Sequence, residues 1–100
     1  MVLKQIWIIS MLNKYTCPVC GYNNLDEAPY DNFGCPSYEI CPCCGVEFGY
    51  DDSGKSHELL RDNWIRNGFK WFSKYNKPPK GWSPVKQLKD AKLWSSILKE

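Results

Sequence analysis

Six cysteines are the residues with the clearest chemistry in this 100-residue chain. Five of them lie in two similar loops, C-P-V-C-G at residues 17–21 and C-P-C-C-G at residues 41–45. A C-x-x-C turn places both thiolates on one side of a tight loop, and the glycine that follows lets the backbone fold back with positive φ. Twenty residues separate Cys20 from Cys41, a spacing typical of four-sulfur zinc sites. We therefore expect one structural Zn²⁺ bound by Cys17, Cys20, Cys41 and Cys44.

Three other uses of these cysteines are open at this point. A disulfide framework would suit an even number of cysteines, but it needs an oxidising compartment, and residues 1–12 lack the cleavage site of a secretory signal. A redox C-x-x-C would need one such loop and a surrounding βαβ pattern, which the sequence does not show. Iron is the alternative metal, because tetrahedral sulfur sites suit iron as well as zinc.

Cys35, Cys43 and His57 remain outside this site. Together they offer three ligands, too few for a second closed metal site. We expect Cys43 to be the solvent-facing inner residue of its loop and Cys35 to be a small apolar packing residue. His57 follows Ser56 near an expected helix start, so we predict an exposed first-turn residue rather than a ligand.

The two cysteine loops resemble the iron-binding loops of rubredoxin, a resemblance that implies iron and electron transfer. The segment between them is shorter than rubredoxins use and lacks their acidic Gly-Asp-Pro stretch. A closer resemblance is to the bacterial cysteine-rich CPCC domain family. It rests on Y-T-C-P-V-C-G-Y at residues 15–22, S-Y-E-I-C-P-C-C at residues 37–44, and L-R-D-N-W at residues 60–64 with Gly68 after it.

This resemblance covers residues 15–68 and has two departures. The extra inner cysteine of the family usually lies in the first loop, whereas here it is Cys43 in the second, and Cys35 stands where a small turn residue is expected. Neither departure touches the four expected ligands. The resemblance implies a small zinc-ribbon-like protein and no particular activity.

The elements that must position the sulfurs give a small α+β fold. Residues 1–14 form an N-terminal extension or strand, or an upstream addition if translation starts at Met11, and residues 15–100 form one zinc-binding domain. Its metal ribbon, residues 15–53, should contain short antiparallel strands, one of them at residues 38–40. Its helical half, residues 54–100, should contain a helix from Ser56 to about residue 67 and an amphipathic helix over residues 83–98.

Charge and composition narrow the function further. The net charge is −5 over residues 1–53 and +7 over residues 54–100, so the halves should attract each other. Basic residues alternate with aromatic ones over residues 66–82, as in proteins that stack on single strands, but four thiolates and one Zn²⁺ would leave no net charge. No apolar run reaches the ~20 residues of a membrane span.

We therefore predict a cytoplasmic, structural zinc-binding protein that acts as a protein-interaction module, with the face of residues 83–98 and Trp94 as a docking surface. A nucleic-acid-binding zinc ribbon and an iron electron carrier are the alternatives. We do not expect an enzyme, because four cysteines close a metal shell, and the acids Glu47, Asp51 and Asp52 are typical of a hydrated loop.

Overall fold

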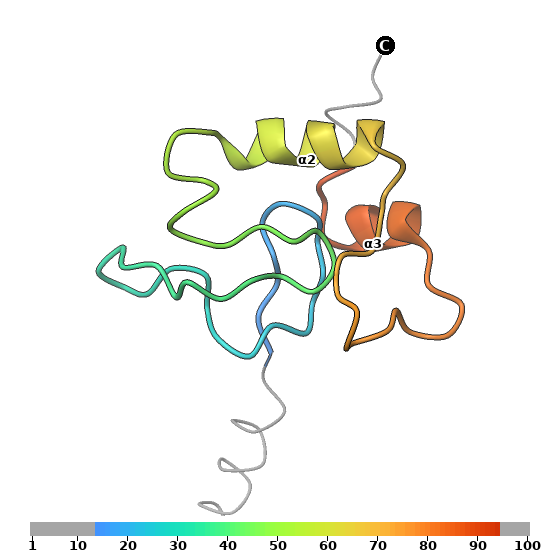
Figure 1. The fold of residues 1–100 in the computed structure, drawn as a ribbon, viewed down its shortest axis with the longest axis horizontal. Coiled ribbons are helices and arrows are strands. Elements are labelled where there is room, and N and C mark those ends of the chain that lie inside the picture. The colour runs from blue at the N-terminus through green and yellow to red at the C-terminus, as the bar shows by residue number, and fades with distance from the viewer. Residues whose placement is uncertain (1–13, 95–100) are drawn as a thin grey trace, which may run out of the picture.

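The computed structural model describes residues 14–94 (Figure 1). Two helices, α2 (His57–Arg66) and α3 (Pro84–Asp90), lie beside a half made of loops that carries all six cysteines. Across these residues, no helix is both long and apolar enough to span a bilayer. The expectation for residues 1–13 falls outside the described part of the chain.

The predicted short strands do not form anywhere in residues 14–94, so that part of the α+β prediction was wrong. The chain there makes three isolated antiparallel bridges, Tyr15 with Leu25, Tyr30 with Pro36, and Ile40 with Glu47. Tyr38, within the expected strand at residues 38–40, has a φ of 60°, which is incompatible with an extended strand. Tight turns on either side leave each pairing only one bridge long.

Helix α2 begins and ends as the sequence predicts. Ser56 is its N-cap, and the Ser56 hydroxyl oxygen accepts a hydrogen bond from the Leu59 N–H at 3.0 Å. At the other end, the Phe69 N–H donates to the Trp64 carbonyl at 3.0 Å, and the two rings pack edge to face with centroids 5.4 Å apart. This backbone closure with its apolar contact is a Schellman cap, which fixes where the following chain turns back to the core.

Helix α3 is shorter than predicted. Ser83 caps its start and Pro84 is its first residue, as expected, but the helix ends at Asp90 instead of running to residue 98. Lys92 has a φ of 61°, and the Leu93 N–H donates to the Leu88 carbonyl at 2.8 Å, which closes the last turn. Leu88 is fully buried, and Leu93 and Trp94 pack against the core beyond the helix end. The apolar residues of this segment therefore cover the core.

The core is built around cysteines. Its fully buried side chains are four of the cysteines together with Val19, Leu25, Phe48 and Leu88. Trp64 of α2 joins the same cluster, so α2 lies against the cysteine half. A chain of this size buries little apolar surface, so any atom that binds these sulfurs together contributes directly to the core.

Candidate metal centre

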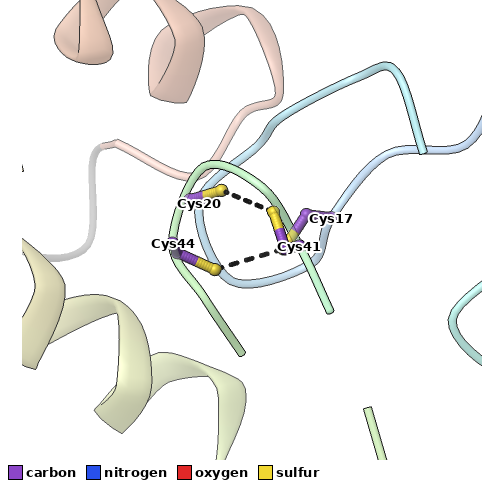
Figure 2. A group of neighbouring side chains, drawn as sticks. All are labelled: Cys17, Cys20, Cys41 and Cys44. Atoms are coloured by element: carbon purple, nitrogen blue, oxygen red, sulfur yellow. Dashed lines mark hydrogen bonds between the residues drawn. The ribbon is translucent and has the colours of Figure 1, made fainter. Parts of the chain in front are cut away.

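The two cysteine loops fold into matching knuckles. In the first, the Gly21 N–H donates to the Cys17 carbonyl at 2.9 Å, and in the second the Gly45 N–H donates to the Cys41 carbonyl at 2.8 Å. Both glycines have positive φ, 86° and 82°, so the repeated sequence produces a repeated turn. Each turn directs its two cysteine side chains toward the other knuckle (Figure 2).

The structure brings the four predicted ligands together in one cluster. The sulfurs of Cys17 and Cys44 lie 3.8 Å apart, those of Cys20 and Cys41 lie 3.7 Å apart, and all four lie within 4.8 Å of one another. Four sulfurs placed tetrahedrally at about 2.3 Å from one ion would be about 3.8 Å apart, whereas a disulfide would need about 2.05 Å. The spacing fits one shared ion and excludes cross-links in this arrangement.

The chemistry of this donor set also fits a divalent cation. Cys17, Cys20 and Cys41 are fully buried, and Cys44 is half-buried. Burial raises the pKa of the Cys20 thiol, while hydrogen bonds from the neighbouring thiols lower the pKa of Cys41. Four thiolates in such a small space repel one another unless a cation lies between them. Four thiolates around a tetrahedral centre suit zinc or iron.

Two side chains of the helical half hold the first knuckle, and the sequence did not single out either. Arg61 of α2 is buried, and its guanidinium donates to the carbonyls of Val19 and Pro18 at 2.8 and 2.9 Å. Gln87 of α3 donates to the Cys20 carbonyl at 2.9 Å. The position of Arg61 was the one signal in the sequence for its role. Arg61 follows Leu60 on the inward side of the helix, and a charged side chain that is buried needs hydrogen-bond partners.

The second knuckle is held by backbone. The Phe72 N–H donates to the Cys43 carbonyl at 3.0 Å, and the Ser73 N–H donates to the Pro42 carbonyl at 2.9 Å. The Phe72 ring lies against Gly45, where an added Cβ would meet its Cδ1 at 2.5 Å. The inner carbonyls of both knuckles are thus bonded by residues from the helical half, which fixes the orientation of the sulfurs.

The predictions for the two remaining cysteines were wrong. The cysteine expected to face solvent is buried, and the one expected to pack inside the protein is exposed. Cys43 is fully buried beside the cluster, and its sulfur accepts a hydrogen bond from the Gln87 amide at 3.4 Å. Cys35 is exposed at a turn, where its backbone N–H donates to the Asp31 carboxylate at 2.9 Å. The second knuckle faces the protein interior on the side of its inner residue, which the repeat alone does not reveal.

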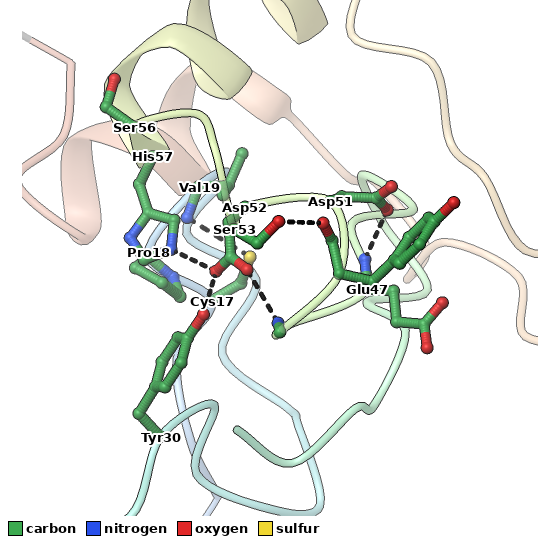
Figure 3. Close-up of polar contacts among 12 residues, drawn as sticks. Cys17, Pro18, Val19, Tyr30, Glu47, Asp51, Asp52, Ser53, Ser56 and His57 are labelled. Atoms are coloured by element: carbon green, nitrogen blue, oxygen red, sulfur yellow. Dashed lines mark hydrogen bonds and ion pairs between the residues drawn. The ribbon is translucent and has the colours of Figure 1, made fainter. Parts of the chain in front are cut away.

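His57 is half-buried and belongs to a polar network, so its prediction as an exposed residue was also wrong (Figure 3). Its Nε2 lies 2.7 Å from the Asp52 carboxylate, which also accepts the Tyr30 hydroxyl at 2.6 Å and the Gly49 N–H at 2.7 Å. The Asp52 side chain is 1% exposed, so this acid is an internal anchor and not part of a hydrated loop. Asp51 beside it accepts the Glu47 N–H at 2.8 Å.

The network shifts the acidity of two of its members. Burial by itself raises the pKa of Asp52, but hydrogen bonds from Tyr30 and His57 outweigh it and leave the pKa below its ordinary value of 3.8. Burial and the hydrogen bond to Asp52 raise the pKa of Tyr30 to about 12. An ionised Asp52 with a protonated Tyr30 therefore ties the start of α2 to the loop at residues 47–52.

The chain is similar to two curated proteins of Bacillus subtilis strain 168. It is 34% identical over 73 residues to the uncharacterised protein YozI, covering 56% of this chain and 60% of that protein. It is 46% identical over 70 residues to the uncharacterised protein YoaQ, covering 54% of this chain and 59% of that protein. The chain thus spans about 60% of the length of these relatives. No family model and no solved structure matches it.

Proposed function

We propose that this chain is a structural zinc protein of the zinc-ribbon type that acts by binding another protein in a reducing compartment, the cytoplasm. The observation that carries the metal assignment is the cluster of four sulfurs within 4.8 Å at the centre of the core. Four thiolates complete a tetrahedral shell, which is typical of structural zinc and leaves no position for a substrate. Binding of the ion then supplies folding free energy, on the order of 10 kcal/mol for small zinc domains.

Elemental analysis of the purified protein tests the metal. We expect one zinc per chain, no visible absorption, and loss of near-ultraviolet circular dichroism when a chelator removes the ion. Cys20→Ser should lose bound zinc, whereas Cys35→Ser, a change at an exposed cysteine, should keep it. A coloured protein with thiolate-to-iron charge-transfer bands would instead identify an iron centre and favour the electron-carrier alternative. A metal-free folded protein would refute both metals.

Exposed aromatic side chains support a protein partner. Tyr75 is 92% exposed, Phe33 is 91% exposed and Tyr50 is 71% exposed, and aromatic residues are enriched in protein interfaces. Trp94 is a poorer candidate than the sequence indicated, because it packs against the core. We expect Phe33→Ser or Tyr75→Ser to weaken capture of a partner without loss of zinc, and equal capture by both variants and the unmodified protein would contradict this role.

Nucleic-acid binding is the second candidate, and one observation weakens it. Trp71 and Trp82 pack edge to face with centroids 5.2 Å apart, and Tyr22 packs on Trp71 at 5.7 Å, so these indoles are engaged within the protein. Fluorescence anisotropy with single-stranded oligonucleotides checks this alternative. Binding that falls steeply with salt and is weakened by Lys74→Glu would favour nucleic acid over protein.

A further inference from the structure

A groove of about 590 Å³ leads from the surface to one of the four sulfur ligands. Trp64, Trp71 and Phe72 provide its apolar lining, Lys55 and Lys70 are its cationic residues, and Cys44 lies in its wall. Cys44 is half-buried, whereas Cys17, Cys20 and Cys41 have no exposed surface. A reagent from solution therefore meets Cys44 before any other ligand of the centre.

The hydrogen bonds to the sulfurs further distinguish Cys44 from Cys17 and Cys41. The Cys17 sulfur accepts the Val19 N–H at 3.4 Å, and the Cys41 sulfur accepts the Cys44 N–H. Within residues 14–94, neither the Cys44 sulfur nor the Cys20 sulfur accepts an N–H hydrogen bond, and Cys20 is fully buried whereas Cys44 is not. A hydrogen bond from an N–H group stabilises a thiolate and lowers its nucleophilicity. The Cys44 sulfur is accessible from solution, and no such hydrogen bond lowers its nucleophilicity.

From these observations we propose that Cys44 is the reactive ligand of the centre, modified by small soft electrophiles that enter through the groove. This inference rests on the proposed zinc site, since coordination is what holds the sulfur as a thiolate. In the step, a lone pair of the Cys44 sulfur forms an S–C bond while the C–X bond breaks, and X⁻ leaves with the bonding electrons. The product is a neutral thioether, a weaker ligand, so modification favours release of the ion.

The lysines determine which electrophile the groove favours. Lys55 and Lys70 are exposed residues of its lining, and the Asp51 carboxylate in the same lining offsets one of their two positive charges. At low ionic strength, this net charge of one cation in the lining would enrich an anionic reagent about twofold. The groove therefore suits an electrophile that carries a carboxylate or a similar anionic group.

Mass spectrometry of the zinc-loaded protein tests the proposal. Zinc is measured first, and the Cys35→Ser variant is then treated with one equivalent of iodoacetamide, so that the exposed cysteine does not consume the reagent. We expect the initial rate of alkylation at Cys44 to be at least fivefold higher than at Cys17, Cys20 or Cys41. Zinc should be released at the same rate as Cys44 is modified. Even labelling of the four, or another ligand ahead, would overturn the inference and leave the zinc site intact, whereas a protein without zinc would overturn both.

The charge preference of the groove is measured by comparing iodoacetate, an anion, with iodoacetamide, which is neutral. The ratio of their rates at Cys44 should fall at least twofold in Lys55→Gln/Lys70→Gln, and should not change in the matched variant Lys74→Gln/Lys80→Gln, whose lysines lie outside the groove lining. All four positions are exposed, so these variants should fold. An equal ratio in the two variants would refute the role of the lysines.

Discussion

Asp52→Asn should destabilise the protein although it removes no apolar contact. Asp52 accepts three hydrogen bonds, from Tyr30, His57 and the Gly49 N–H, and its side chain is 1% exposed, so water cannot replace them. Hydrogen bonds to a charged group contribute about 1.5–3 kcal/mol each. An asparagine oxygen in place of Oδ2 keeps only neutral bonds from Tyr30 and His57, and the amide NH2 then faces the Gly49 N–H without an acceptor. We expect a loss of about 3 kcal/mol in the free energy of unfolding.

Denaturation by guanidinium chloride at a fixed excess of zinc, followed by tryptophan fluorescence, measures this loss. The pKa of Asp52 is lower in the folded protein than its ordinary value of 3.8, so its carboxylate stabilises the fold fully above that pH and loses the effect as pH falls through the folded value. At pH 7 the whole contribution is present, which makes this the pH for the comparison.

Asp90→Asn provides the control, because Asp90 makes one ion pair with Lys86 at 3.0 Å and its side chain is 67% exposed. Exposed pairs of this kind contribute about 0.5 kcal/mol or less. If Asp52→Asn costs no more than Asp90→Asn, the buried network does not stabilise the start of α2, and the reasoning from its hydrogen bonds is wrong.

Two further changes test how the helical half holds the knuckles. Gly45→Ala should cost over 2 kcal/mol in unfolding free energy, because the added Cβ meets the Phe72 ring. The control Gly68→Ala, also at positive φ but in open space, should cost only about 1–2 kcal/mol. Equal losses in the two variants, measured by thermal denaturation, would contradict the clash with Phe72. Arg61→Met should lower the free energy of unfolding by about 3 kcal/mol and raise the dissociation constant for zinc in a competition assay. The control Arg66→Met, at a side chain that is 74% exposed, should leave stability and zinc affinity nearly unchanged. Similar zinc affinity in the two variants would refute the link between Arg61 and the centre.

Local signals in the sequence were sufficient for the knuckles and the helix starts. The repeated C-P-x-C-G places Gly21 and Gly45 at the same point of the same turn, and a serine cap is a property of a few neighbouring residues. These features need no information from distant parts of the chain. The clustering of the four sulfurs followed from the repeat, because two such turns can satisfy one tetrahedral site together.

The errors concern what distant segments do to a residue. Whether Cys43 or Cys35 is buried depends on where Gln87 and the segment after α2 cover the knuckle, and Asp52 becomes internal only because Tyr30 and His57 converge on it. Helix α3 could not be bounded from its periodicity, since the apolar residues after Asp90 serve the core equally well without a helix. The spacing of residues along the sequence predicts one element at a time and does not predict contacts between distant segments.

Among the described residues, no ion pair between a lysine or arginine and a carboxylate joins the acidic half to the basic half. Within residues 14–94, such pairs link Lys14 to Asp26 in the acidic half, and Arg66 to Asp62 and Lys86 to Asp90 in the basic half. Among the contacts that do connect the halves, the side chains of Arg61 and Gln87 bind carbonyls of the first knuckle. Because those carbonyls belong to the same turn that holds two of the sulfurs, a change in the position of the sulfurs must also change the attachment of both helices. The four-sulfur cluster and the two helices are therefore parts of one structural unit.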